Sequence, residues 1–187
     1  MQKIIYSIVI VLTCLLCIPS YAAKVMFTHK GKPAFLLTSN PHSTKSYLKN
    51  FPAYWETYGN RLIVFNPKTL SFGIYNSQGR KIGAGKAVGG ATWSPKLGRS
   101  AKTVRGTFTI YRKNGANYKS SKYPRPYGGA PMYFAMHFHG GYALHGSPSL
   151  PNVNASHGCI RVEKNTAGWL SKNFVQKNLT QVHIMEY

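Results

Sequence analysis

A histidine and a cysteine stand close together in the sequence, and each has a glycine beside it. His145-Gly146 lies fourteen residues before Cys159, which belongs to the run SHGCIR at residues 156–161. A thiol attacks a carbonyl carbon as its thiolate, and a nearby imidazole that accepts the thiol proton supplies that form near neutral pH. Glycine before the cysteine permits a tight turn that brings backbone N–H groups close to a reacting carbonyl. The pattern therefore predicts a cysteine nucleophile and its histidine base on two neighbouring segments.

These motifs resemble those of a known family. HG, then a Pro/Asn/Ser loop, then SHGCIR is similar to the signature of the L,D-transpeptidase catalytic domain, the YkuD-like cysteine enzymes of bacterial cell-wall assembly. The resemblance covers about residues 60–187 and implies a mostly β fold, an antiparallel sheet with one or two short helices. In the family a Thr-Pro-x-Gly run opens one strand, whereas residues 103–106 read Thr-Val-Arg-Gly, and the loop at residues 146–155 is shorter than in many members.

The resemblance also implies roles for single residues. Cys159 matches the nucleophile and His145 the general base, with the carbonyl of Gly146 holding the second imidazole nitrogen; Ser147 is the less favoured orienting partner. Arg161 either binds a substrate carboxylate or braces the loop. The backbone N–H groups of Gly158 and Cys159 are expected to stabilise an oxyanion. Further oxyanion or substrate contacts are expected from His157, Ser156 and Tyr133.

The reaction that the resemblance implies is a two-step acyl transfer without a cofactor. The thiolate attacks the carbonyl of the third residue of a peptidoglycan tetrapeptide stem and releases the terminal D-alanine. An amine then takes the acyl group from the thioester, giving a 3→3 cross-link or an attachment to another amine. With water as acceptor the same site is an L,D-carboxypeptidase.

The N-terminus predicts export. A basic start, an apolar run and the small-residue ending Ser-Tyr-Ala indicate a signal peptide at residues 1–22, cleaved after Ala22. An uncleaved membrane anchor is the alternative, although the apolar run is short for a membrane span. Cleavage removes Cys14 and Cys17, so Cys159 would remain alone in an oxidising compartment, without an internal disulfide partner. The expected product is a secreted or periplasmic protein with an N-terminal extension at residues 23–59 and a catalytic domain at residues 60–187.

The charge is strongly positive. The chain has 24 Lys and Arg residues, no Asp and three acidic residues, Glu56, Glu163 and Glu186. A paired-carboxylate glycosidase needs two neighbouring acids, and a Ser-His-Asp triad needs an acidic member, so neither chemistry is expected. The excess of base indicates anionic envelope polymers as partners, or simply a solvated face, and export argues against nucleic acid. A non-catalytic cationic protein that binds envelope polymers remains an alternative function.

Apolar alternation and turn residues predict the elements around the motif. Residues 114–131 are interpreted either as a wall or lid of a substrate groove or as a surface loop. Strands are expected at residues 61–66, 69–75, 81–88, 103–112 and 181–185, and short helices at residues 43–58 and from a cap at Asn165 or Thr166 to Phe174.

A hairpin is predicted to carry the base. Residues 132–139 alternate, Gly140-Gly141 suits a two-residue turn, and residues 142–145 return. This turn places Met136 opposite His145, so His137 and His139 would face the other side of the sheet. A zinc site is the rival interpretation, because imidazole and thiolate are common zinc ligands; the opposed faces and the lack of a nearby carboxylate argue against it. Its candidate ligands are His137, His139, His145, His157 and Cys159.

Overall fold

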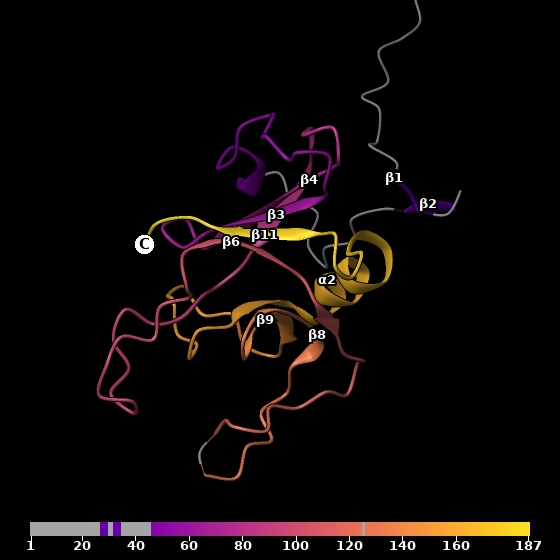
Figure 1. The fold of residues 1–187 in the computed structure, drawn as a ribbon. Helices are drawn as coiled ribbons and strands as arrows, with labels where there is room; N and C mark the ends of the chain where they lie inside the picture. Colours follow the sequence, from indigo (N-terminus) through magenta and orange to yellow (C-terminus); the bar gives the residue numbers. More distant parts are fainter. Residues whose placement is uncertain (1–26, 30–31, 35–45, 125) are drawn as a thin grey trace, which may run out of the picture.

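The computed structural model describes residues 27–29, 32–34, 46–124 and 126–187, and it is mostly β (Figure 1). The expected signal peptide at residues 1–22 lies outside these ranges. One sheet has the strand order β5-β4-β3-β11-β6 and a second has the order β10-β9-β8-β7, while β1 and β2 form a separate pair. The strands are β1 (Phe27–His29), β2 (Lys32–Ala34), β3 (Leu62–Asn66), β4 (Ser71–Tyr75), β5 (Lys81–Lys86), β6 (Gly106–Thr109), β7 (Arg112–Lys113), β8 (Tyr133–His139), β9 (Tyr142–Ser147), β10 (Ile160–Glu163) and β11 (Gln181–Ile184).

The expected mostly β fold with short helices is confirmed, but the sheets are not purely antiparallel. β9 pairs with β10 in parallel, and β3 pairs with β11 in parallel. Parallel neighbours need a connection of about a dozen residues or more. The loop at residues 148–159 serves this purpose between β9 and β10, and it places Cys159 directly before β10.

The main core lies between the two large sheets. Ile63, Phe65 and Phe72 come from the five-stranded sheet, and Met136 and Leu144 from the four-stranded sheet; all are almost fully buried. Side chains alternate across a strand, so the residues next to Met136 and Leu144 in sequence face away from this core. The functional side chains of β8 and β9 therefore project from the outer face of the four-stranded sheet.

A second cluster covers the outer face of the five-stranded sheet. Tyr47, Leu48 and Trp55 pack against a group that includes Phe51 and Tyr75. The segment at residues 46–60 thus lies on the sheet away from the four-stranded layer (Figure 1). In the described part of the expected helix at residues 43–58, only residues 46–48 are helical. Pro52 accounts for this early end, since the residue before a proline is disfavoured in the helical region.

The expected strand at residues 103–112 is two strands in different sheets. β6 pairs with β11, and β7 pairs with β8. The change of sheet occurs between Ile110, whose N–H donates to Thr180, and Tyr111, whose N–H donates to His137. Apolar alternation alone does not reveal this switch, because both halves keep the pattern of one extended strand.

The C-terminal helical segment begins earlier than predicted and changes type. The helix α2 (Lys164–Trp169) follows the cap residue Glu163, which makes no side-chain capping bond, so neither Asn165 nor Thr166 is the cap. β10 runs directly into this helix and thereby fixes its start. The π-helix η1 (Leu170–Phe174) continues it and ends at the predicted residue.

The predicted register of the hairpin that carries His145 is wrong by one residue. His139 pairs with Tyr142, as a two-residue turn requires, but His137 pairs with Ala143, and Met136 with Leu144. The register shift between His137 and His139 is a bulge that adds one residue to β8, and a one-residue slip exchanges the faces of a strand. His137 therefore shares its face with Ala143 and with His145, contrary to the prediction.

Among the described residues, no helix combines the length and the apolar composition needed to cross a membrane.

Candidate active site

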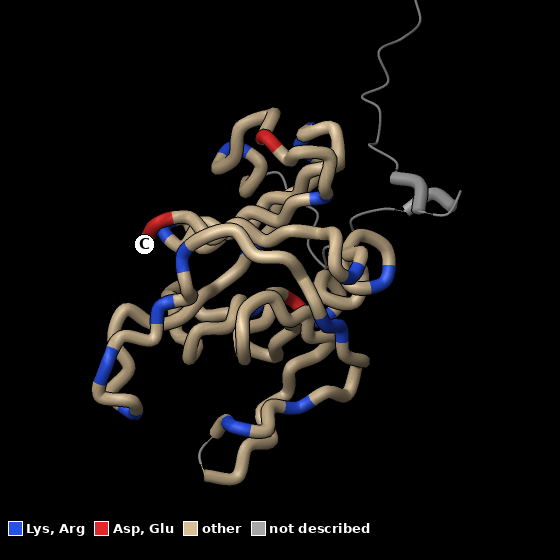
Figure 2. Tube along the Cα trace, in the orientation of Figure 1, with Lys and Arg blue, Asp and Glu red and all other residues tan. Residues whose placement is uncertain are grey.

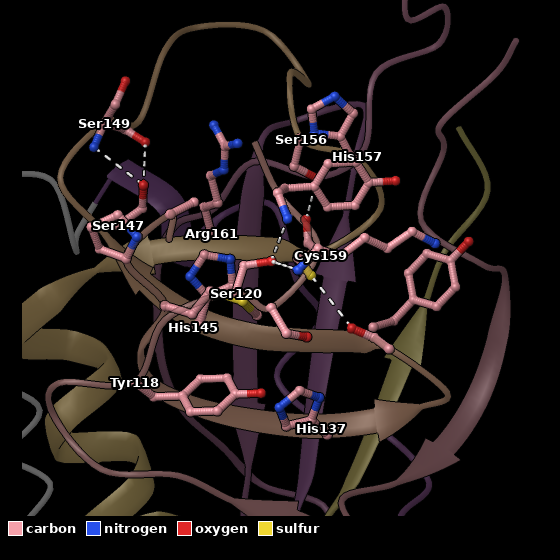
Figure 3. A pocket seen from close by; sticks show the side chains of 18 of the residues that line it. Tyr118, Ser120, His137, His145, Ser147, Ser149, Ser156, His157, Cys159 and Arg161 are labelled. Atoms are coloured by element: carbon pink, nitrogen blue, oxygen red, sulfur yellow. Dashed lines mark hydrogen bonds between the residues drawn. The ribbon is translucent and has the colours of Figure 1, made fainter. Parts of the chain in front are cut away.

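A cavity of about 510 Å³ opens on the outer face of the four-stranded sheet, and it brings together the residues of the sequence motif. Cys159, His145 and Arg161 line it, and Ser156 and His157 belong to its wall as well (Figure 3). β10 and β9 fix this arrangement, because Arg161 and His145 are direct partners in the parallel pairing. The cysteine precedes that pair by two residues and so lies on the same face.

The imidazole of His145 is buried and held in one tautomer. Its Nδ1 lies 2.9 Å from the carbonyl oxygen of Gly146. Since a carbonyl only accepts hydrogen bonds, Nδ1 carries the proton and Nε2 keeps its lone pair. Burial lowers the pKa of His145 to about 4; the Gly146 carbonyl opposes this shift, whereas the charge of Arg161 and, when it is protonated, that of His137 add to it. The ring is therefore neutral near pH 7 and able to accept a proton.

The thiol of Cys159 is half-buried and neutral in this structure. Its Sγ lies 3.9 Å from the carbonyl oxygen of Gly141. Burial raises the pKa of the Cys159 thiol, and this outweighs the Ala143 backbone N–H and the charge of Arg161, which both favour the thiolate. The sequence suggested a thiolate made ready by the imidazole, whereas these shifts indicate a neutral thiol next to a neutral imidazole.

One hydroxyl holds the turn that carries the nucleophile. Ser156 Oγ donates to the carbonyl oxygen of Cys159 at 2.5 Å and accepts the N–H of Gly158 at 3.0 Å. Gly158 has a φ of +123°, and a Cβ there would lie 2.1 Å from Cε1 of Tyr142. Only glycine fits this turn without displacing that ring. The N–H of Gly158, which was expected to contact an oxyanion, donates to Ser156 in this structure.

Arg161 and His137 line the cavity together with Cys159 and His145. Arg161 is partly buried beside Cys159. On β8, His137 accepts a hydrogen bond at its Nε2 from Arg112 of β7, with 3.0 Å between the nitrogens. Burial and the charge of Arg112 lower the pKa of His137 to about 4, so Arg112 is paired with a neutral ring.

Two loops complete the cavity wall, and sequence reasoning identified only one of them as a candidate. The segment at residues 114–131 was interpreted either as a groove wall or as a surface loop. It forms a wall, to which it contributes Tyr118, Lys122 and Tyr123. The ring of Tyr123 stacks on His157, with 4.3 Å between centroids and 3° between planes. Arg99 reaches the cavity from the Gly-rich loop at residues 89–102. Apart from its basic residues, the sequence of this loop gave no indication of a role in substrate binding.

Two sequence candidates lie outside the cavity lining. Tyr133 is half-buried under Lys164, whose Nζ lies 4.5 Å from the ring centroid. His139 is exposed and contacts the ring of Phe108 instead. Zinc was discounted because His137 and His145 were expected on opposite faces, and that reason is wrong; still, no group of three or more His, Cys, Asp or Glu side chains in the described ranges is arranged to hold a metal ion.

Comparison with known proteins agrees with the sequence motif. The family model of the YkuD L,D-transpeptidase catalytic domain matches residues 60–184. A solved L,D-transpeptidase from Xylanimonas cellulosilytica has 26% identity and a TM-score of 0.59 over 73% of this chain and 66% of that one. An L,D-transpeptidase from Mycobacterium smegmatis has 23% identity and a TM-score of 0.54 over 68% of this chain and 59% of that one.

A third similar structure is L,D-transpeptidase 3 from Mycobacterium tuberculosis in complex with a faropenem-derived adduct, with 20% identity and a TM-score of 0.54. It matches over 68% of this chain and 60% of that one. The chain thus spans less than two thirds of the length of these solved proteins. None of the curated proteins matches the sequence.

Proposed function

The chain belongs to the L,D-transpeptidase catalytic domain family, and we propose that it transfers acyl groups between peptidoglycan stem peptides with Cys159 as nucleophile. The observation that carries this proposal is the shared cavity of Cys159 and a buried, neutral His145 whose Nδ1–H is held by Gly146. A neutral imidazole with a free Nε2 is the state that a general base needs before the reaction. The tautomer is fixed without a carboxylate, in a chain that has no aspartate.

The proposed first step forms a thioester. The Cys159 proton passes to Nε2 of His145 as Sγ attacks the carbonyl carbon of the third residue in the tetrapeptide stem. The tetrahedral intermediate then collapses, the bond to D-alanine breaks, and the imidazolium returns the proton to the leaving amine. Because the resting thiol is neutral, this proton transfer accompanies the attack.

The second step transfers the acyl group to an amine. The acceptor nitrogen attacks the thioester carbon and its proton goes to His145. As the C–S bond breaks, the imidazolium passes that proton to Sγ and regenerates the thiol of Cys159. An acceptor amine from another stem gives a 3→3 cross-link, and water gives a shortened stem instead. We place this reaction in the cell envelope, with residues 1–22 as the signal peptide.

Stabilisation of the oxyanion is assigned to the N–H of Cys159. The N–H of Gly158, the other backbone donor on this turn, is bound by Ser156. A backbone donor at the nucleophile itself lies close to any tetrahedral carbon bonded to Sγ, and one such donor contributes about 100-fold to 1,000-fold in rate.

Arg161 is assigned to a carboxylate of the donor stem. Its partly buried guanidinium lines the cavity beside Cys159. A guanidinium recognises a carboxylate through two parallel hydrogen bonds. The alternative role as a brace for the loop is less well supported, because Ser156 already holds that turn.

Mass spectrometry of muropeptides tests the proposal. The full chain and its Cys159→Ala variant are incubated with purified tetrapeptide stems under reducing conditions. We expect cross-linked dimers that have lost D-alanine with the wild type and none with the variant. Tripeptide monomers alone would change the assignment to an L,D-carboxypeptidase, and unchanged stems would refute acyl transfer to or from these peptides.

Acylation by a penem gives an independent readout of the nucleophile. Faropenem, which forms the adduct in the Mycobacterium tuberculosis structure, is added to the wild type, the Cys159→Ala variant and a His145→Gln variant. Intact-mass analysis should show one adduct on the wild type, none without the cysteine and a much slower adduct without the imidazole. Equal adduct on the cysteine-free variant would refute the assignment of Cys159.

A further inference from the structure

The active-site cavity is lined by four positive side chains and by no acidic one. Arg161 lies on β10 and Arg112 on β7, the two edge strands of the four-stranded sheet, and both side chains line the cavity. Arg99 and Lys122 belong to the two loops that border the cavity. Among their described residues, the loop at 89–102 has three Lys or Arg positions and the loop at 114–131 has two, and neither has an acidic one (Figure 2).

Three of these positive side chains contact neutral groups. Arg99 donates to the backbone carbonyl of Ser100 at 3.3 Å, and Nζ of Lys122 lies 5.7 Å from the ring centroid of Tyr123. Arg112 donates to a neutral imidazole. The sequence has no acidic residue between Glu56 and Glu163, so no carboxylate lies near these loops along the chain.

Like charges around one cavity repel each other, and a bound anion relieves that repulsion. A cavity lined by one sign of charge also focuses the field and raises the local concentration of the opposite charge. One carboxylate is enough to satisfy Arg161. Three other cations line the cavity, and two of them, Arg99 and Lys122, are exposed side chains on loops. They suit a ligand that carries further negative charges.

A stem tetrapeptide differs in charge according to its amidation. Its terminal residue always carries a carboxylate. Residue 2 carries a second carboxylate when it is a free acid and none when it is amidated. The same holds for residue 3 where it is a dicarboxylic diamino acid. The free-acid peptide therefore has three carboxylates that the cations of the cavity could bind, whereas the fully amidated peptide has only the terminal one.

We propose that this site selects the free-acid stem tetrapeptide over the amidated one, and that Arg99 and Lys122 are the residues that make the distinction. The inference rests on the proposed function and names its substrate class. Both side chains are exposed, so each contact with a carboxylate is screened and contributes about two- to fivefold in affinity. Together they give a preference of about tenfold at low salt, and the preference declines as salt rises.

The test measures binding to the full-length Cys159→Ala variant, so that turnover does not interfere. Isothermal titration calorimetry compares the free-acid tetrapeptide with the same peptide amidated at residues 2 and 3, at 50 and at 300 mM salt. We expect about tenfold tighter binding of the free acid at the lower salt. Adding Arg99→Gln and Lys122→Gln should remove most of that preference and leave the affinity for the diamide nearly unchanged.

A matched control separates a local contact from net charge. The control carries Lys68→Gln and Lys177→Gln in the same Cys159→Ala background. It also removes two positive charges, but from exposed positions that do not line the cavity. This control should keep the tenfold preference. Equal affinity for the two peptides, or an equal loss of preference in the control, would overturn the proposal. Turnover of neither peptide by the wild type would refute the proposed function separately, since the binding comparison still decides the preference.

Discussion

Replacing Ser156 by alanine tests whether one buried hydroxyl holds the nucleophile in place. Ser156 is only 2% exposed, and its Oγ bonds to the Cys159 carbonyl at 2.5 Å and to the Gly158 N–H at 3.0 Å. The substitution removes both bonds and leaves a buried N–H without a partner. A typical hydrogen bond contributes about 0.5–1.5 kcal/mol and an orphaned buried group costs about 1–3 kcal/mol, so the free energy of unfolding should fall by about 2–4 kcal/mol.

The same substitution should lower activity beyond its effect on stability. Without the hydroxyl, the backbone of Cys159 is no longer tied to the turn, and its Sγ loses a fixed position relative to His145. A misplacement of about 1 Å costs on the order of 100-fold in rate. We therefore expect kcat/KM for D-alanine release to fall about 10- to 100-fold, measured well below the melting transition.

Ser71→Ala is the matched control. Ser71 is also fully buried, and its Oγ bonds to Asn50 Nδ2 at 3.2 Å and to Thr69 Oγ1 at 2.6 Å, at the start of β4 and outside the cavity lining. Urea titration of both variants should show similar losses of stability, but only Ser156→Ala should lose activity. If both variants kept the wild-type kcat/KM, the link between this hydroxyl and the position of the nucleophile would be refuted.

Four further predictions concern the turn that carries Cys159 and the protons of Cys159 and His145. Because the pKa of His145 is lowered to about 4, kcat/KM should stay level from about pH 5.5 to 8, and an acid limb centred near 6.5 would contradict a buried neutral base. The same shift means that the unfolded chain binds more protons than the folded chain between pH 6.5 and 4, so the melting temperature should fall across that window. Because the pKa of Cys159 is raised above 9.0, less than about 1% of it is thiolate at pH 7, and iodoacetamide should alkylate it more slowly than a free cysteine. Gly158→Ala should abolish turnover through the clash with Tyr142, whereas Gly59→Ala, which has a similar left-handed strain (φ +79°) but no atom within 4 Å of its new Cβ, should lose some stability and keep activity.

The sequence was informative where the chemistry is local. The order of HG and SHGCIR placed Cys159 and His145 in one cavity, and the absence of aspartate agreed with a backbone carbonyl as the partner of Nδ1. Both features depend on residues that are neighbours along the chain or on adjacent paired strands. Turn residues and apolar alternation also located β3, β4, β5 and β11 to within about two residues, because each is one uninterrupted strand.

The sequence was misleading where one residue changes the face of a strand. The Gly140-Gly141 turn was correctly located, but the bulge between His137 and His139 reversed the side on which His137 lies. Nothing in the local alternation marks that bulge, because Phe138 packs in the core at 3% exposure and Met136 does so as well. Bulges of this kind follow from how the strand must bend to meet its neighbours, which is a property of the assembled sheet.

The protonation states of Cys159 and His145 could not be predicted from the sequence, because they too depend on the assembled structure. A histidine next to a cysteine suggests a thiolate–imidazolium pair, which is the favoured state when charge is stabilised by solvent or by a carboxylate. Here burial acts on both groups in the direction of neutrality, raising the pKa of Cys159 and lowering that of His145, and Arg161 further disfavours a charged imidazole while it favours the thiolate. A carboxylate partner for the imidazolium would reverse the balance, but the Gly146 carbonyl is a dipole and stabilises the positive ring far less than a full charge does. The resting pair is therefore neutral, and in the proposed reaction Sγ and the imidazole become charged only while Cys159 is being acylated.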